Sequence, residues 1–256
     1  MTRMLLSLAF TVSALPALAA VEETSSMATA LSSAGPDTLV VLDIDNTLLQ
    51  PVGYLGGDAW YEFLVQRAVR EGLTRDAAID RAMTAFNDAQ YAIDVRAVEP
   101  ATPALVKEAH ARGARVIALT ARTPDIAPRT LAQLDHIGVG FSVIAKPDIA
   151  PKGTRLDQGV LFVGDHLDKG EMLVALLRAS RLQPKRVIFV DDKQRHAESV
   201  DRALAKAGIP CRSFRYGAAD ADVERFWRDV GDVRFLVDGQ PSPETTKKIT
   251  QAKVAP

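Results

Sequence analysis

The stretch TLVVLDIDNT at residues 38–47 decides the fold. Its first half, Thr38 to Leu42, is apolar and rich in β-branched side chains, with no polar alternation. Such a run is typical of a strand that is buried on both faces of a parallel sheet. The second half is polar and carries two acids, Asp43 and Asp45. Similar apolar runs follow at residues 115–120, 160–163 and 186–190, and weaker strand candidates lie at 211–214 and 141–145.

Helical segments separate these apolar runs. Thr102-Pro103 and Thr123-Pro124 each place a capping residue before a proline, which indicates the start of a helix. Strand and helix therefore alternate as far as Phe214, which predicts an α/β fold with a Rossmann-like, doubly wound parallel sheet. The expected helices cover residues 102–111, 123–137, 169–181 and 195–207.

The connection between the first two strands is far longer than the dozen or so residues that a parallel crossover needs. It contains a glycine-rich turn and two amphipathic segments, at 58–71 and 74–90. We therefore expect a small helical cap insertion at 48–99, and a core made of residues 37–47 and 100–237.

The two ends of the chain read differently from the core. Residues 1–19 have a basic start, a short apolar run and the small residues Ala17-Leu18-Ala19, which is the pattern of a cleaved signal peptide. This predicts an exported protein, periplasmic or secreted, and no later stretch is apolar enough to span a membrane. Residues 20–36 read as a linker, and the polar residues 238–256 as a disordered tail.

Composition narrows the function classes. Hydrophobic residues make up 47% of the 256 residues and charged residues 25%, which suits a globular protein. The 31 basic and 32 acidic residues give a net charge of −1, so nothing points to a nucleic-acid partner. The single cysteine, Cys211, cannot form an internal disulfide. The sequence does not indicate an oligomeric state.

A polar cluster follows each of the four apolar runs. The carboxyl ends of parallel strands share one edge of a sheet, where open α/β sheets bind ligands. The acids among these residues would repel one another unless a cation neutralises them, and an all-oxygen donor set favours Mg²⁺. The residues are Asp43 and Asp45 after the first run, Thr120 and Arg122 after the second, Asp165 and Lys169 after the third, and Asp191 and Asp192 after the fourth.

These motifs, in this order, resemble the haloacid dehalogenase (HAD) superfamily. Within it, VVLDIDNTLLQPVGYLGGDAW, FVGDHLDKGEML and RVIFVDDK resemble the DUF2608 group of exported HAD-like proteins. The resemblance covers roughly residues 39–216. It implies a phosphatase for small phosphomonoesters, because superfamily members that act on carbon–halogen bonds lack the second acid of DxD.

The resemblance also implies a role for each residue. Asp43 would be the nucleophile that forms an aspartyl-phosphate, and Asp45 the general acid and base. Lys169 would neutralise the nucleophile and the phosphate. Mg²⁺ would be held by Asp43, Asp191 and the backbone carbonyl of Asp45, with Asp192 assisting. Substrate contacts would come from Thr120, Arg122 and Lys169.

Several alternatives stay open on the sequence alone. Lys152 competes with Lys169 for the lysine position, although only Lys169 opens an apolar helix that leads to the RVIFV strand. For Arg122, a substrate contact and a surface position are equally compatible with the sequence. Asp58 is predicted to be a helix N-cap. The chain could also be a non-catalytic HAD-like binding or effector protein. A phospho-receiver domain is disfavoured, because its acidic pair precedes its phospho-accepting aspartate.

Overall fold

The computed structural model describes residues 21–144 and 149–230. The predicted signal peptide at 1–19 and the predicted tail at 238–256 lie outside the described residues. The last part of the predicted core, residues 231–237, does so too.

The described chain is built on a seven-stranded sheet with the order β1-β9-β8-β2-β5-β7-β6. Neighbouring strands run parallel except for the edge pair β6 and β7. All five residues of β2 are buried, as the unbroken apolar pattern predicts for a central strand. The strands are β1 (Glu22–Thr24), β2 (Thr38–Leu42), β5 (Arg115–Thr120), β6 (Arg155–Asp157), β7 (Val160–Phe162), β8 (Arg186–Asp191) and β9 (Cys211–Tyr216).

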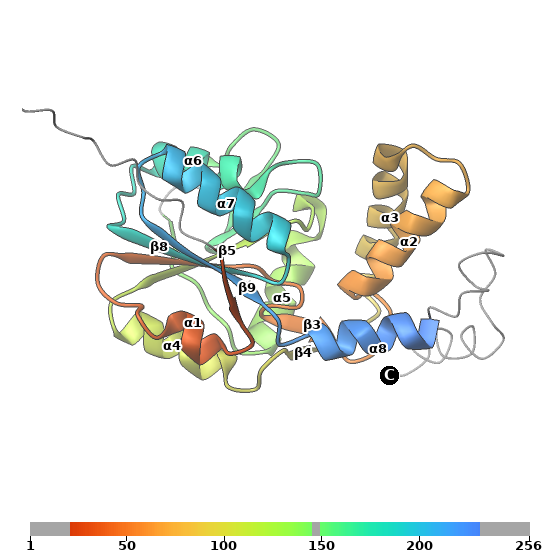
Figure 1. The fold of residues 1–256 in the computed structure, drawn as a ribbon, viewed down its shortest axis with the longest axis horizontal. Helices are drawn as coiled ribbons and strands as arrows, with labels where there is room; N and C mark the ends of the chain where they lie inside the picture. The colour runs from red at the N-terminus through yellow and green to blue at the C-terminus, as the bar shows by residue number, and fades with distance from the viewer. Residues whose placement is uncertain (1–20, 145–148, 231–256) are drawn as a thin grey trace, which may run out of the picture.

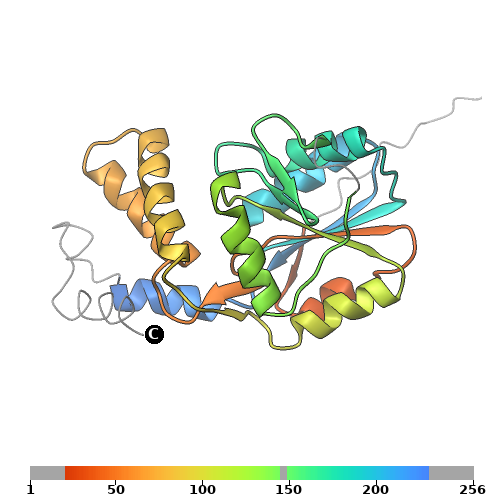
Figure 2. The same ribbon diagram turned by 180° about the vertical axis from the view of Figure 1, so that it is seen from behind.

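Helices cover both faces of this sheet, which confirms the predicted α/β doubly wound fold (Figures 1 and 2). Alternate residues of β2 point to opposite faces. Val40 and Leu42 belong to one buried cluster and Leu39 and Val41 to the other. One face carries α1 (Met27–Leu31), α4 (Thr102–Ala111) and α5 (Ala127–His136), and the other carries α6 (Lys169–Ser180) and α7 (Gln194–Lys206).

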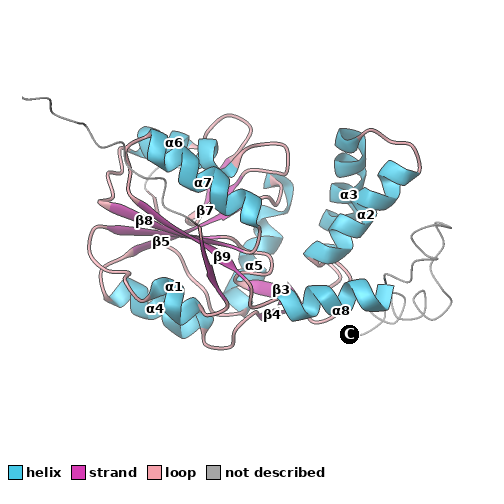
Figure 3. Cartoon of the chain, in the orientation of Figure 1, coloured by secondary structure: helices cyan, strands magenta, loops and turns pink. Residues whose placement is uncertain are grey.

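The segment predicted as a helical cap contains two helices, α2 (Asp58–Arg70) and α3 (Arg75–Gln90). A short antiparallel ribbon leads into and out of it, formed by β3 (Leu49–Pro51) and β4 (Val95–Ala97). In Figures 1 and 3 the two helices stand beyond the edge of the magenta sheet, with α8 (Asp220–Val230) along their base. The boundaries of the cap at 48 and 99 stay a prediction.

Residues 20–36 were predicted to be a linker, and this is wrong. Strand β1 extends the sheet beside β9, and Met27 and Leu31 of α1 are buried in the core. Ser26 caps α1 by accepting a hydrogen bond from the Thr29 backbone N–H. The Ser, Ala and Thr-rich composition concealed these elements, because each is too short to show a hydrophobic period.

Three further elements differ from the sequence expectations. Residues 141–144 form no strand. Beside β5, the Ser142 backbone N–H donates to Val116 O, but the Ser142 hydroxyl takes the place of a carbonyl by accepting from Val116 N–H. The helix expected at 123–137 begins with a 3₁₀ turn at Pro124–Ile126. Helix α8 was not predicted at all.

Candidate active site

The predicted cluster of polar residues assembles at the carboxyl edge of the sheet. Asp43 follows β2 directly, Thr120 ends β5 and Asp191 ends β8. Strand β2 lies between β5 and β8, and its last residue, Leu42, pairs with Ala118 and Val190. The Asp43 backbone N–H continues this ladder by donating to Val190 O at 2.9 Å. The strand order therefore places residues that are far apart in sequence side by side.

Lys169 lies between the two acids of the central strands. Its Nζ is 2.6 Å from Oδ1 of Asp43 and 2.7 Å from Oδ2 of Asp191. All three side chains are buried. Lys169 is the first residue of α6, and Asp168 caps this helix by accepting from the Glu171 backbone N–H. The rival candidate, Lys152, is exposed.

Burial and charge act against each other in this trio. Burial raises the pKa of Asp43 to about 7, although the Lys169 ammonium opposes the shift. Burial acts on Asp191 too, but the Lys169 charge and the contact with His196 hold its pKa well below the usual range. Burial would lower the pKa of Lys169, but the two carboxylates outweigh it and raise that pKa. Lys169 is therefore a fixed cation at neutral pH.

Asp43, Asp191 and Asp192 can present carboxylate oxygens within 4.8 Å of one another. Burial raises the pKa of Asp192 well above its usual value, and the negative charges of Asp58 and Asp191 add to the shift. The neighbouring acids thus disfavour one another's ionised forms, and a bound cation would favour those forms. A compact set of carboxylate oxygen donors fits a hard divalent cation such as Mg²⁺.

Asp45 does not join this acidic group. Its carboxylate accepts two hydrogen bonds from Arg122, at 2.8 Å from Nε and at 2.9 Å from Nη2. Arg122 is buried, so its reading as a surface residue is wrong. The Asp45 side chain is therefore directed to Arg122, and the metal contact predicted for the backbone carbonyl of Asp45 stays a prediction.

Thr120 lies at the wall of a cavity between the strand ends and the cap. It is buried, and its hydroxyl accepts from the Arg122 backbone N–H at 3.1 Å. The cavity measures about 40 Å³ and joins core and cap side chains. Its lining includes the core residues Asp43, Asp45, Thr120, Arg122 and Lys169, and the cap residues Asp58, Tyr61, Met83 and Phe86.

Sequence reasoning missed the contacts that join the cap to the core. Lys193 Nζ lies 2.9 Å from both Asp58 and Glu62 of α2. Asp58 is not the predicted N-cap, because Gly57 holds that position. Tyr61 Oη donates to Asp165 at 2.6 Å. The only signal for Lys193 was its place directly after the Asp191-Asp192 pair.

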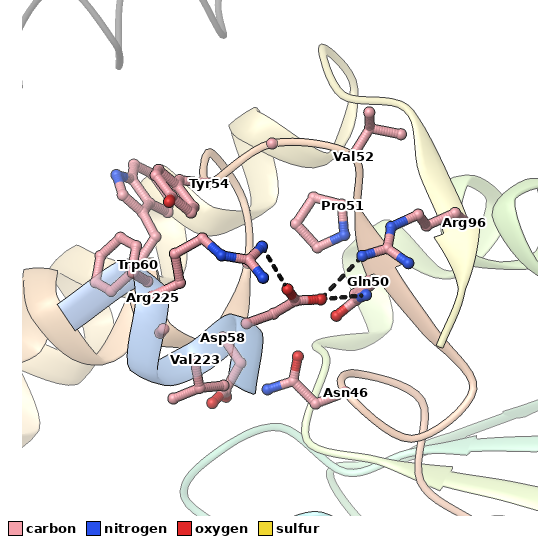
Figure 4. Close-up of a pocket in the computed structure, with 15 residues that line it drawn as sticks. Asn46, Gln50, Pro51, Val52, Tyr54, Asp58, Trp60, Arg96, Val223 and Arg225 are labelled. Atoms are coloured by element: carbon pink, nitrogen blue, oxygen red, sulfur yellow. Dashed lines mark hydrogen bonds and ion pairs between the residues drawn. The ribbon is translucent and has the colours of Figure 1, made fainter. Parts of the chain in front are cut away.

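A second cavity of about 90 Å³ lies at the base of the cap. Asp222 of α8 accepts hydrogen bonds there from Gln50, Arg96 and Arg225, as the dashed lines of Figure 4 show. Asn46 borders this cavity, and its Nδ2 donates to Asp192 at 3.1 Å. One carboxylate, that of Asp222, thus pairs with two arginines at this cavity.

The fold and the site define an α/β protein with a cluster of acids and a buried lysine at the carboxyl edge of a doubly wound sheet. The sequence profile of DUF2608, described as a protein of unknown function, matches residues 20–239. The chain belongs to this family.

Curated relatives occur in Chlamydia. Proteins of Chlamydia trachomatis serovar D and Chlamydia pneumoniae are each 24% identical over 198 residues, which is 77% of this chain and 76% or 75% of theirs. A Chlamydia muridarum protein is 24% identical over 201 residues, with 77% and 76% of the two chains covered. Their names describe them as candidate outer membrane proteins. Among the described residues, no helix is long and apolar enough to cross a membrane.

One solved structure is also similar. It is a HAD family hydrolase from Salmonella enterica serovar Typhi, with a TM-score of 0.39 and 12% identity. The match covers 72% of this chain and 70% of the Salmonella chain.

Proposed function

We propose that this protein is an exported, Mg²⁺-dependent phosphatase that hydrolyses a small phosphomonoester through an aspartyl-phosphate on Asp43. The observation that carries the proposal is the position of Lys169, within 2.7 Å of both Asp43 and Asp191 at the strand ends. A carboxylate attacks phosphorus only if nearby cations neutralise the charge between them, and this arrangement supplies one such cation.

In the first step, an Asp43 carboxylate oxygen forms a bond to phosphorus while the ester P–O bond breaks. Asp45, as a carboxylic acid, gives its proton to the leaving oxygen, so that an alcohol departs. The Thr120 hydroxyl and the Lys169 ammonium bind the phosphoryl oxygens. A divalent cation held by Asp43, Asp191 and Asp192 would neutralise further charge on the phosphoryl group.

In the second step, Asp45 is a carboxylate and takes a proton from water. The water oxygen forms a bond to phosphorus, the bond to Asp43 breaks, and inorganic phosphate leaves. Tyr61, Met83 and Phe86 of the cap line the cavity above these groups and reduce the access of bulk water.

The acid pair also weighs against a role in binding alone. A binding cleft has no need for a second acid beside the nucleophile. In this chain Asp45 is oriented by two hydrogen bonds at the wall of the cavity.

The test is a turnover assay on chain purified from residue 20 onward. The substrates are p-nitrophenyl phosphate and a panel of sugar, nucleoside and alkyl phosphates, each with Mg²⁺ or with EDTA. We expect Mg²⁺-dependent release of phosphate that Asp43→Asn abolishes.

The matched control is Asp37→Asn, which makes the same substitution at an exposed acid bonded to Lys185. It should keep full activity. Absence of turnover across the whole panel, or full activity in Asp43→Asn, would refute the proposal. Export is tested separately, by sequencing the N-terminus of the secreted or periplasmic product, which should begin near residue 20.

A further inference from the structure

Nearly all the hydrogen-bonding capacity of Arg122 is used inside the protein. Its Nε and Nη2 donate to the two oxygens of Asp45, and its Nη1 donates to Thr130 at 3.0 Å and to Gln133 at 2.6 Å. These bonds occupy four of the five N–H groups of a guanidinium. Its side chain is 1% exposed. Little of this arginine remains for a substrate, so the predicted substrate contact is not its main engagement.

The two bonds fix the plane of the Asp45 carboxylate. A paired fork-to-carboxylate contact restrains rotation as well as position, because both oxygens are held at once. Asp45 nevertheless remains 17% exposed at the side chain and borders the same cavity as Asp43 and Lys169. Each oxygen keeps a second lone pair, so Asp45 can still exchange a proton on its cavity side.

The support of Arg122 continues into the cap. Gln133 Nε2 donates to Gln90 Oε1 at 3.2 Å, and Gln90 Nε2 donates to Gly56 O at 2.8 Å. Gln90 ends α3 and Gly56 lies just before α2. The guanidinium carbon also lies 5.7 Å from the centre of the Phe86 ring of α3. A continuous series of polar contacts thus links Asp45 to the segment before α2 and to the end of α3 in the cap.

We infer that Arg122 is the positioning residue of the general acid and base, holding Asp45 in the orientation for proton exchange, and that Gln133 and Gln90 tie this orientation to the cap. The inference rests on the proposed phosphatase function. Arg122 itself neither gives nor takes a proton.

This role has a signature that depends on the leaving group. p-Nitrophenolate departs readily as an anion, whereas a simple alkoxide departs only with the proton from Asp45. General acid catalysis of such a step contributes on the order of 10²–10⁴-fold. A misplaced Asp45 therefore slows transfer from an alkyl phosphate much more than transfer from p-nitrophenyl phosphate. A loss of general structural integrity slows both substrates alike.

The experiment measures kcat/KM of Arg122→Lys on p-nitrophenyl phosphate and on ethyl phosphate. This parameter reports the first transfer, before Asp45 acts as a base. Lysine keeps the charge but cannot form the paired contact. We expect the loss on ethyl phosphate to exceed the loss on p-nitrophenyl phosphate by at least about tenfold, as partial removal of acid catalysis requires. In an Asp45→Asn background, Arg122→Lys should cause no further loss on either ester.

Two more variants keep the test decisive if Arg122→Lys folds poorly. Gln133→Met removes one support of the guanidinium and should give a smaller loss with the same preference for ethyl phosphate. Arg112→Lys makes the same change at an arginine that donates to Leu31 O and Ala34 O, away from the site, and should affect both esters equally.

Equal losses on the two esters in Arg122→Lys and Gln133→Met, or full additivity with Asp45→Asn, would overturn the inference while the wild-type enzyme stays active. A wild-type protein inactive on every ester would instead overturn the proposed function, and this inference with it. The two failures are thus distinguishable.

Discussion

Replacing Lys169 with methionine tests the electrostatics of the site without any assumption about a substrate. Methionine fills much of the same volume but leaves Asp43 and Asp191 buried together with no cation between them. At about 2.7 Å and an effective dielectric constant of about 20, each lost attraction amounts to about 6 kcal/mol before desolvation. The desolvation of the lysine offsets much of this. Removing one partner of a buried ion pair therefore has a net cost of about 3–5 kcal/mol.

The assay is thermal unfolding by circular dichroism in EDTA. For a chain of this size, about 1 kcal/mol corresponds to about 2–4 °C, so Lys169→Met should lower Tm by roughly 6–20 °C. Added Mg²⁺ should restore more of the Tm in the variant than it adds to the wild type, because in the variant no lysine offsets the charge of the acids.

Lys185→Met is the control for the loss of a lysine as such. Lys185 pairs with Asp37 at 2.7 Å, but both side chains are largely exposed, so we expect no measurable change in Tm. A Tm of Lys169→Met within about 2 °C of the wild type in EDTA would refute the reasoning, because that shift corresponds to less than about 1 kcal/mol.

Three other predictions concern the fold. Burial raises the pKa of the Cys211 thiol to about 12, so that in the native protein at pH 8 only about one thiol in 10⁴ is ionised. The rate of labelling by a thiol reagent should therefore be low at pH 8 and rise about tenfold per pH unit. Rapid labelling at pH 8 would contradict this prediction. A Cβ on Gly170 would lie 2.5 Å from Ser199 O, so Gly170→Ala should destabilise by about 1–3 kcal/mol in urea, whereas Gly140→Ala, with no atom within 4 Å, should not. Met27→Ala should lower the free energy of unfolding by about 2–5 kcal/mol, because Met27 is fully buried. Unchanged stability would instead support the prediction that residues 20–36 are a linker.

The centre of the sheet could be predicted because β2, β5 and β8 are continuous apolar runs of five or six residues with polar residues only at their ends. Runs such as Thr38–Leu42 and Arg115–Thr120 match the structure at both ends, since burial on both faces leaves no polar residue within the run except at its ends. Parallel order then determines where the strands end, and so the meeting of Asp43, Thr120 and Asp191 could be predicted as well. Lys169 could be chosen over Lys152 because it begins an apolar helix that leads to the next strand.

The rest could not be predicted because it depends on side-chain direction or on very short elements. No pattern in DIDNT says that the Asp45 carboxylate turns to Arg122, which is 77 residues away. Asp58 and Lys193 are paired only because the cap folds back over the core. Strand β1 has three residues, too few for any periodicity. In each case the deciding contact is tertiary, and local sequence carries no record of it.

The packing of helix α8 has a consequence for the order in which the molecule matures on the ribosome. Phe226 stacks edge-on against Tyr54 and Phe63, with ring centres 5.5 and 6.3 Å apart, and Tyr54 Oη donates to Asp229. Polypeptides are synthesised from the N-terminus, so the inserted helices emerge long before the segment that completes their hydrophobic base. A nascent chain that stops short of residue 226 therefore contains every proposed reacting group, but its cap helices lack the aromatic contacts that Phe226 makes with Tyr54 and Phe63.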